Sequence, residues 1–152
     1  MNNENAIVAL NALITINNDR IIGYKTASDS TDELDLKSLF SKLILTSEKC
    51  KQQLVLEVQV LGGKTVDETK VTGKFFRVWM DVKATLSGKD RKAILNSCDY
   101  GEDNAKATYD QAILHEFEHL SAKQKTMVLA QKSLLKVDHE LVKSLRSALV
   151  NL

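Results

Sequence analysis

The sequence contains no proline and only six glycines in its 152 residues. Proline breaks a helix because it lacks the backbone N–H and its ring clashes with the preceding turn, so a chain without proline is typical of long helices. No segment alternates apolar and polar residues for long, which argues against a fold rich in strands. These absences favour an all-α protein.

Cysteine is scarce, and neither sign of charge is in clear excess. Cys50 and Cys98 lack the Cys-x-x-Cys spacing of metal sites, and we expect both to be small buried core residues. The 21 basic and 20 acidic residues are interleaved and leave a formal charge of +1. Proteins that hold nucleic acid usually carry a basic excess on one face, so we expect no nucleic-acid partner.

Long apolar runs are absent as well. None approaches the roughly 20 residues that a helix needs to cross a bilayer. The opening residues Met1–Asn5 are polar and do not have the pattern of a signal peptide. We therefore expect no membrane partner and a cytoplasmic location.

Apolar residues spaced alternately three and four apart predict four long helices. We expect these helices at about 3–29, 31–61, 90–118 and 122 to the C-terminus. Ser30 with Glu33, and Ser121 with Gln124, have the spacing of capping boxes at helix starts. The pair Gly62–Gly63 predicts the end of the second helix, because glycine tolerates the left-handed conformation found there.

The segment between Gly63 and Gly88 is too long for a tight turn. The spacing of its apolar residues predicts a short amphipathic helix with Phe75, Val78, Trp79, Val82 and Leu86 on one side. At ~1.5 Å per residue, such a helix can carry the chain roughly 20 Å back along a bundle. The sequence thus predicts one four-helix-bundle domain over residues 1–152, with a long crossover, parallel second and third helices, and Trp79 packed on the bundle.

Short landmarks occur in a characteristic order along most of the chain. They are Leu10 and Leu13 ahead of Asp19, Gly23–Tyr24, Ala27, Gly62–Gly63, Gly73 before Trp79 and Lys83, and Gly101–Glu102–Asp103 ahead of Tyr109. In this order the chain resembles a bacterial family with a domain of unknown function and a ferritin-like four-helix bundle. The resemblance implies the fold and does not imply an activity, because one fold hosts many functions.

Di-iron proteins of the ferritin type need a Glu from each of two helices and a Glu-x-x-His from each of the other two. The chain has one such motif, Glu116 with His119, so the complete ligand set is absent and no cofactor is expected. His115 and His119 are four apart, so a regular helix would place them on one face, where with Glu116 they form a weak candidate metal site. We favour a solvated helix end as the interpretation of this segment.

A second group consists of polar residues within or beside the apolar stripes. Asn17, Ser47 and Asp138 fall within these stripes, Glu102 falls at the edge of one, and Arg20 lies one turn from Asn17. We expect them near one level of the bundle, where carboxylates must be hydrogen-bonded, ion-paired or metal-bound. We favour a structural layer that fixes helix register. A metal or small-ligand site is the alternative, and its carboxylates would favour hard cations.

The sequence leaves the function open between three classes, and it identifies no catalytic residue. We favour a non-catalytic, ferritin-like helical bundle that acts through binding in a stress or accessory role. A metalloprotein or oxidoreductase with a non-standard carboxylate site is the first alternative, in which a metal ion would be the cofactor. The second is a helical protein–protein interaction module, including a homo-oligomer through helical faces, because Val8, Ile16 and Ile22 lie off the main stripe of the first helix.

Overall fold

The computed structural model describes residues 3–65 and 91–150, and within these ranges the chain is helical and contains no strand. The four long helices are α1 (Glu4–Asp29), α2 (Leu34–Val60), α4 (Arg91–Gln111) and α5 (Ala122–Val150). Two short elements follow α4, the π-helix η1 (Ala112–Glu116) and the 3-10 helix η2 (Phe117–His119). None of the helices described here combines the length and apolarity that a membrane crossing requires.

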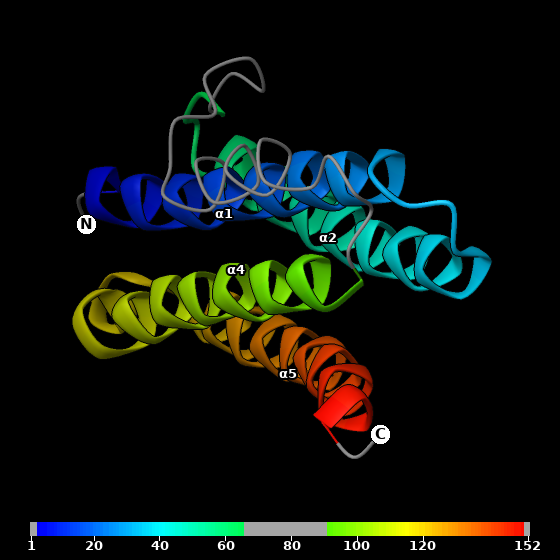
Figure 1. Ribbon diagram of the computed structural model, residues 1–152. Coiled ribbons are helices and arrows are strands. Elements are labelled where there is room, and N and C mark those ends of the chain that lie inside the picture. Colours follow the sequence, from blue (N-terminus) through cyan, green and yellow to red (C-terminus); the bar gives the residue numbers. More distant parts are fainter. Residues whose placement is uncertain (1–2, 66–90, 151–152) are drawn as a thin grey trace.

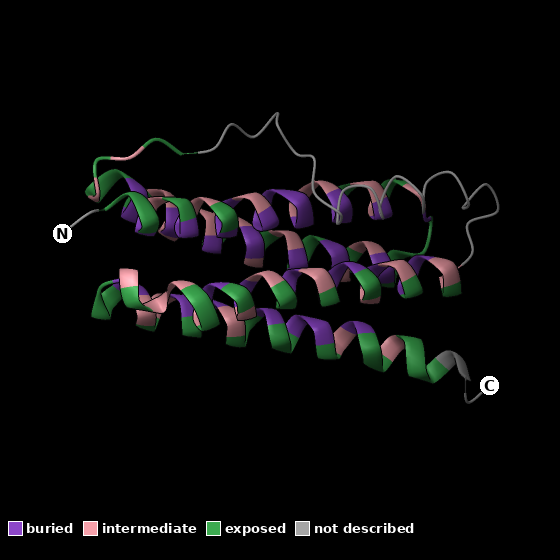
Figure 2. Ribbon diagram, turned by 90° about the vertical axis from the view of Figure 1, so that its left-hand side faces the viewer, coloured by how far each residue is buried: buried purple, intermediate pink, exposed green. Residues whose placement is uncertain are grey.

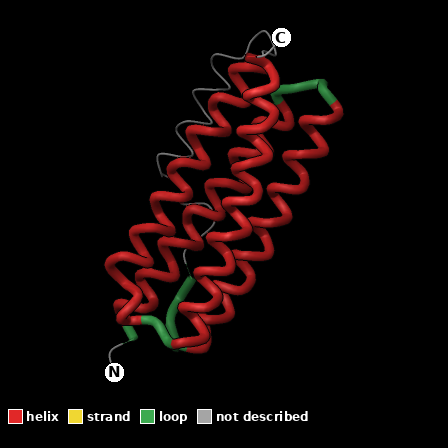
Figure 3. Tube along the Cα trace, turned by 90° about the horizontal axis from the view of Figure 1, so that it is seen from below, coloured by secondary structure: helices red, strands yellow, loops and turns green. Residues whose placement is uncertain are grey.

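The helices form two antiparallel hairpins, α1 with α2 and α4 with α5, that pack side by side (Figures 1 and 3). Arg91, the first residue of α4, forms ion pairs with Glu33 and Asp35 at the start of α2. Helices α2 and α4 therefore run in the same direction, as the length of the intervening segment predicted. The predicted amphipathic helix and Trp79 lie outside the described residues.

Two helix ends follow the local sequence as predicted. Gly62, which follows the C-cap residue Leu61 of α2, has a positive φ of 79°, and the N–H of Gly63 donates to the carbonyl of Val58 at 2.9 Å. At the start of α5, the Ser121 hydroxyl accepts a hydrogen bond from the Gln124 N–H at 3.1 Å, and the Gln124 side chain accepts one from the Ser121 N–H at 3.0 Å. This reciprocal pair is a capping box.

Two other predicted helix ends are wrong. Ser30 does not cap α2, because its hydroxyl donates to the carbonyl of Thr26 at 2.8 Å and so extends the last turn of α1. The third long helix does not continue to residue 118. Its α-helical part stops at Gln111 and the chain passes through the π and 3-10 turns of η1 and η2.

The buried residues lie on the inward sides of the four helices (Figure 2). On α5 the buried apolar residues are Val128, Leu135 and Val142, whereas the neighbouring Leu134 is exposed. Both flanks of α5 are apolar, so the periodicity alone did not decide which flank is covered. Cys50 and Cys98 are free and fully buried, as predicted, and burial raises the pKa of the Cys50 thiol to about 11.

Candidate functional site

The guanidinium of Arg20 on α1 is fully buried at the centre of the bundle. Its Nε lies 2.6 Å from Oε1 of Glu102 on α4, and its Nη2 lies 3.1 Å from Oε2 of the same carboxylate. Nη2 also lies 3.4 Å from Oδ2 of Asp138 on α5, and Nη1 donates to the hydroxyl of Ser47 on α2. One side chain thus joins all four helices, and we call Arg20, Ser47, Glu102 and Asp138 the arginine layer.

The charged side chains of the arginine layer are almost fully buried. Burial by itself lowers the pKa of Arg20 and is the largest single effect, but the contributions of Glu102, Tyr24 and Asp138 together outweigh it and hold the pKa above its usual value. Burial raises the pKa of Asp138, and the nearby guanidinium only partly opposes this rise. The guanidinium also lies 5.5 Å from the centre of the Tyr24 ring, which stacks on Phe40. The cation is therefore held by two carboxylates, a hydroxyl and an aromatic face.

Asn17 belongs to a second chain of hydrogen bonds. Its side-chain amide donates to the hydroxyl of Tyr109 at 2.9 Å, and that hydroxyl donates to Oε1 of Gln131 at 2.7 Å. The Gln131 amide then donates to the backbone carbonyl of Cys50 at 3.2 Å and to the side chain of Gln53 at 3.0 Å. We call Asn17, Tyr109 and Gln131 the amide layer. It too joins all four helices.

The sequence placed Asn17, Ser47 and Asp138 on inward faces, and the structure buries all three together with Arg20 and Glu102. It divides them between the two layers, because Asn17 bonds to Tyr109 and has no hydrogen bond to Arg20. Tyr109 and Gln131 were not predicted as site residues. Their signal was a polar group within an apolar stripe, the same signal that marked Asn17.

The weak metal candidates His115, Glu116 and His119 lie in η1 and η2. The regular α-helix ends at Gln111, before both histidines, so the regular helical face that their spacing assumed is not present here. His119 Nε2 instead lies 3.9 Å from Glu116 and 3.5 Å from Glu118 within its own segment. His115 is exposed and lines a surface pocket of about 350 Å³ between α1 and η1.

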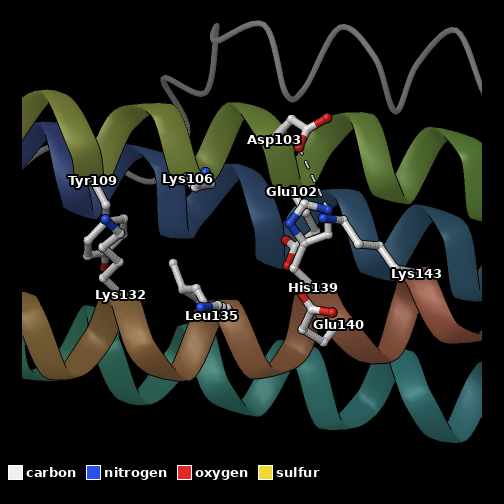
Figure 4. A pocket seen from close by; sticks show the side chains of 10 residues that line it. Glu102, Asp103, Lys106, Tyr109, Lys132, Leu135, His139, Glu140 and Lys143 are labelled. Atoms are coloured by element: carbon white, nitrogen blue, oxygen red, sulfur yellow. Dashed lines mark ion pairs between the residues drawn. The ribbon is translucent and has the colours of Figure 1, made fainter.

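A further polar group that the sequence did not reveal lies between α4 and α5. His139 Nε2 is 2.7 Å from Oδ1 of Asp99 and 3.8 Å from Oδ1 of Asp103, and Arg146 pairs with Oδ2 of Asp99. An adjacent pocket of about 240 Å³ is lined by ten residues of these two helices (Figure 4). They are Glu102, Asp103, Lys106, Tyr109, Lys132, Leu135, Lys136, His139, Glu140 and Lys143.

Asp19 on α1 is also buried, with 1% of its surface exposed. No hydrogen bond from the described residues reaches its Oδ1. Burial raises the pKa of Asp19 to about 6. The carboxyl lies off the main stripe of α1, so periodicity did not mark it as buried.

The model of a domain of unknown function (DUF2383) matches residues 5–115, which include α1, α2, α4 and most of η1. Arg20, Ser47 and Glu102 fall inside the matched range, and Asp138 and His139 fall after it. No curated protein matches the chain.

Proposed function

The chain belongs to the family of the domain of unknown function DUF2383, and for this member we propose a non-catalytic, ferritin-like helical bundle that acts through binding in an accessory role. The observation that carries the proposal is the arginine layer. Arg20 binds both oxygens of Glu102 and approaches Asp138. The inward carboxylates of α4 and α5 are thus already neutralised by a side chain of the same protein.

A protein cation at this position disfavours a metal ion in the bundle core. The guanidinium keeps its charge at all physiological pH values, and at short range it would repel a divalent cation strongly in so buried a place. The two carboxylates would also have to exchange their hydrogen bonds with Arg20 for metal bonds. These costs support a structural role for the layer, in which it fixes the register of the four helices.

Iron chemistry in the core is tested by metal analysis and by ferrous oxidation assays on protein without a histidine tag. We expect wild type and Glu102→Gln alike to oxidise ferrous iron no faster than buffer. Two irons per wild-type chain, lost in Glu102→Gln, would overturn the proposal and favour a metalloprotein.

Exposed apolar side chains favour a helical interaction module as a second candidate function. On α2, Leu45, Leu56 and Val60 are 65%, 60% and 76% exposed. Their spacings of 11 and 4 residues place them along one side of the helix. Such a stripe is typical of a face that contacts another protein, including a second copy of this chain.

Sedimentation of wild type and Leu56→Lys over a range of concentrations tests self-association. We expect wild type to associate and Leu56→Lys to weaken this, with Asn96→Lys on the exposed side of α4 as the matched control. A wild type that stays monomeric throughout would contradict the homo-oligomer form of this candidate.

A further inference from the structure

Three metal-ligating side chains converge where α4 packs against α5. Asp99 and Asp103 are four residues apart, so they lie on one face of α4. His139 of α5 points between them, with Nε2 2.7 Å and 3.8 Å from their Oδ1 atoms. One ligand atom from each of the three residues lies within 4.8 Å of the other two.

We propose that Asp99, Asp103 and His139 bind one divalent transition-metal ion of the zinc type. Imidazole nitrogen and carboxylate oxygen bind zinc at about 2.0–2.2 Å, which requires the ligand atoms to lie roughly 3–4 Å from one another. The 2.7 Å between His139 Nε2 and Asp99 Oδ1 is shorter than this, so metal binding would move these two atoms apart. Ionised carboxylates only accept hydrogen bonds, so the hydrogen bond to Asp99 requires a proton on His139 Nε2. A metal ion bound at Nε2 would replace this proton.

The surroundings hold two of the three ligands in place. The side chains of His139 and Asp99 are only 8% and 14% exposed. Asp99 offers Oδ1 to His139, while Arg146 pairs with its Oδ2. A partner on the second oxygen of a ligating carboxylate is the usual outer support of a metal site.

The third ligand leaves the site open. The Asp103 side chain is 65% exposed, which gives an ion access from solvent. Asp103 and His139 also line the pocket of about 240 Å³, where water can complete the coordination (Figure 4). Three protein ligands with one open position are typical of zinc sites that exchange ligands, unlike closed structural sites.

Positive groups around the site set its expected strength. Lys106, Lys136 and Lys143 line the same pocket, and Arg146 already pairs with Asp99. Their charge opposes a cation, so we expect weaker binding than at a closed four-ligand zinc site. The site shares no ligand with the arginine layer, and this inference stands whether or not the proposed function holds.

Calorimetric titration of chelator-treated, tag-free protein with Zn²⁺ tests the site, and Co²⁺ absorption gives an independent readout of ligand geometry. We expect one Zn²⁺ per chain, with binding weakened roughly tenfold or more in Asp103→Asn and in His139→Gln. His119→Gln is the matched control, because His119 also lies near two carboxylates. It should bind Zn²⁺ as the wild type does.

If His139→Gln disturbs folding, the loss of Zn²⁺ binding in Asp103→Asn alone tests the site. The Asp103 side chain is exposed, so this substitution should leave the fold intact. Absence of saturable one-to-one Zn²⁺ binding would overturn the inference. Binding that survives in Asp103→Asn and is lost in His119→Gln would also overturn it. Loss of the ion in Glu102→Gln with retention in Asp103→Asn would place the metal in the core and contradict both this inference and the proposed function.

Discussion

Arg20 and Glu102 face each other inside the bundle through two parallel hydrogen bonds, of 2.6 Å from Nε and 3.1 Å from Nη2. The planar guanidinium matches the carboxylate geometry, which makes this the strongest form of such a pair. Both side chains are buried, so neither charge has water as a substitute partner. The pair ties α1 to α4, two helices that come from different hairpins.

The amide layer depends on a single hydroxyl group. Tyr109→Phe removes the bridge between Asn17 and Gln131 and leaves the Gln131 carbonyl oxygen without its donor. We expect a loss of about 1–3 kcal/mol in the free energy of unfolding, measured with urea. The control Tyr100→Phe alters an exposed ring and should change stability by less than about 0.5 kcal/mol. Equal effects of the two substitutions would contradict this role of Tyr109.

Asp19 should make stability depend on pH. Its pKa of about 6 in the folded protein exceeds the roughly 3.9 of an unfolded chain, so the folded state holds the proton more tightly. Its ionisation therefore lowers stability progressively as the pH rises from about 4 to about 6.

Asp19→Asn removes this ionisation. Relative to wild type, we expect the variant to gain about 2 kcal/mol in unfolding free energy between pH 4 and pH 7. Asp29, the last residue of the same helix, is exposed, so Asp29→Asn is the control. If the difference in unfolding free energy between wild type and Asp19→Asn is the same at every pH in this range, the raised pKa assigned to Asp19 is wrong.

The two predicted capping boxes differ in the structure, and their serines should differ in effect. Ser121→Ala removes the hydroxyl that accepts from the Gln124 N–H and should cost about 1 kcal/mol. Ser30→Ala removes only a bond to a carbonyl in the last turn of α1, so we expect less than about 0.5 kcal/mol. Chemical denaturation of both variants measures this contrast. A larger loss of stability for Ser30→Ala than for Ser121→Ala would contradict this contrast and would favour the predicted capping box between Ser30 and Glu33.

Local sequence was sufficient for features that depend on neighbouring residues. Gly62 ends α2 and Ser121 caps α5, because backbone freedom and side-chain reach over three residues decide such ends. The inward placement of Ser47 and Asp138 follows from the 3.6-residue period of a helix.

Contacts between helices could not be predicted in the same way. The pairing of His139 with Asp99 depends on how α4 and α5 are rotated and shifted against each other, and apolar stripes fix this only to within about a turn. The sequence placed Arg20 one turn from Asn17 but did not show that its long side chain reaches the centre of the bundle. The change from α- to π-helix at Ala112 left no sign in the apolar pattern, so His115 and His119 were assigned a common face.

The most direct test compares the unfolding free energies of wild type, Arg20→Met, and the triple variant Arg20→Met, Glu102→Leu, Asp138→Leu. If the arginine layer is structural, the single substitution strands two buried carboxylates and should cost about 3–5 kcal/mol. The triple variant removes all of these charges, and its stability should return to within about 1–2 kcal/mol of wild type or exceed it. A single variant as stable as wild type, or a triple variant less stable than the single one, would contradict the structural role of the arginine layer.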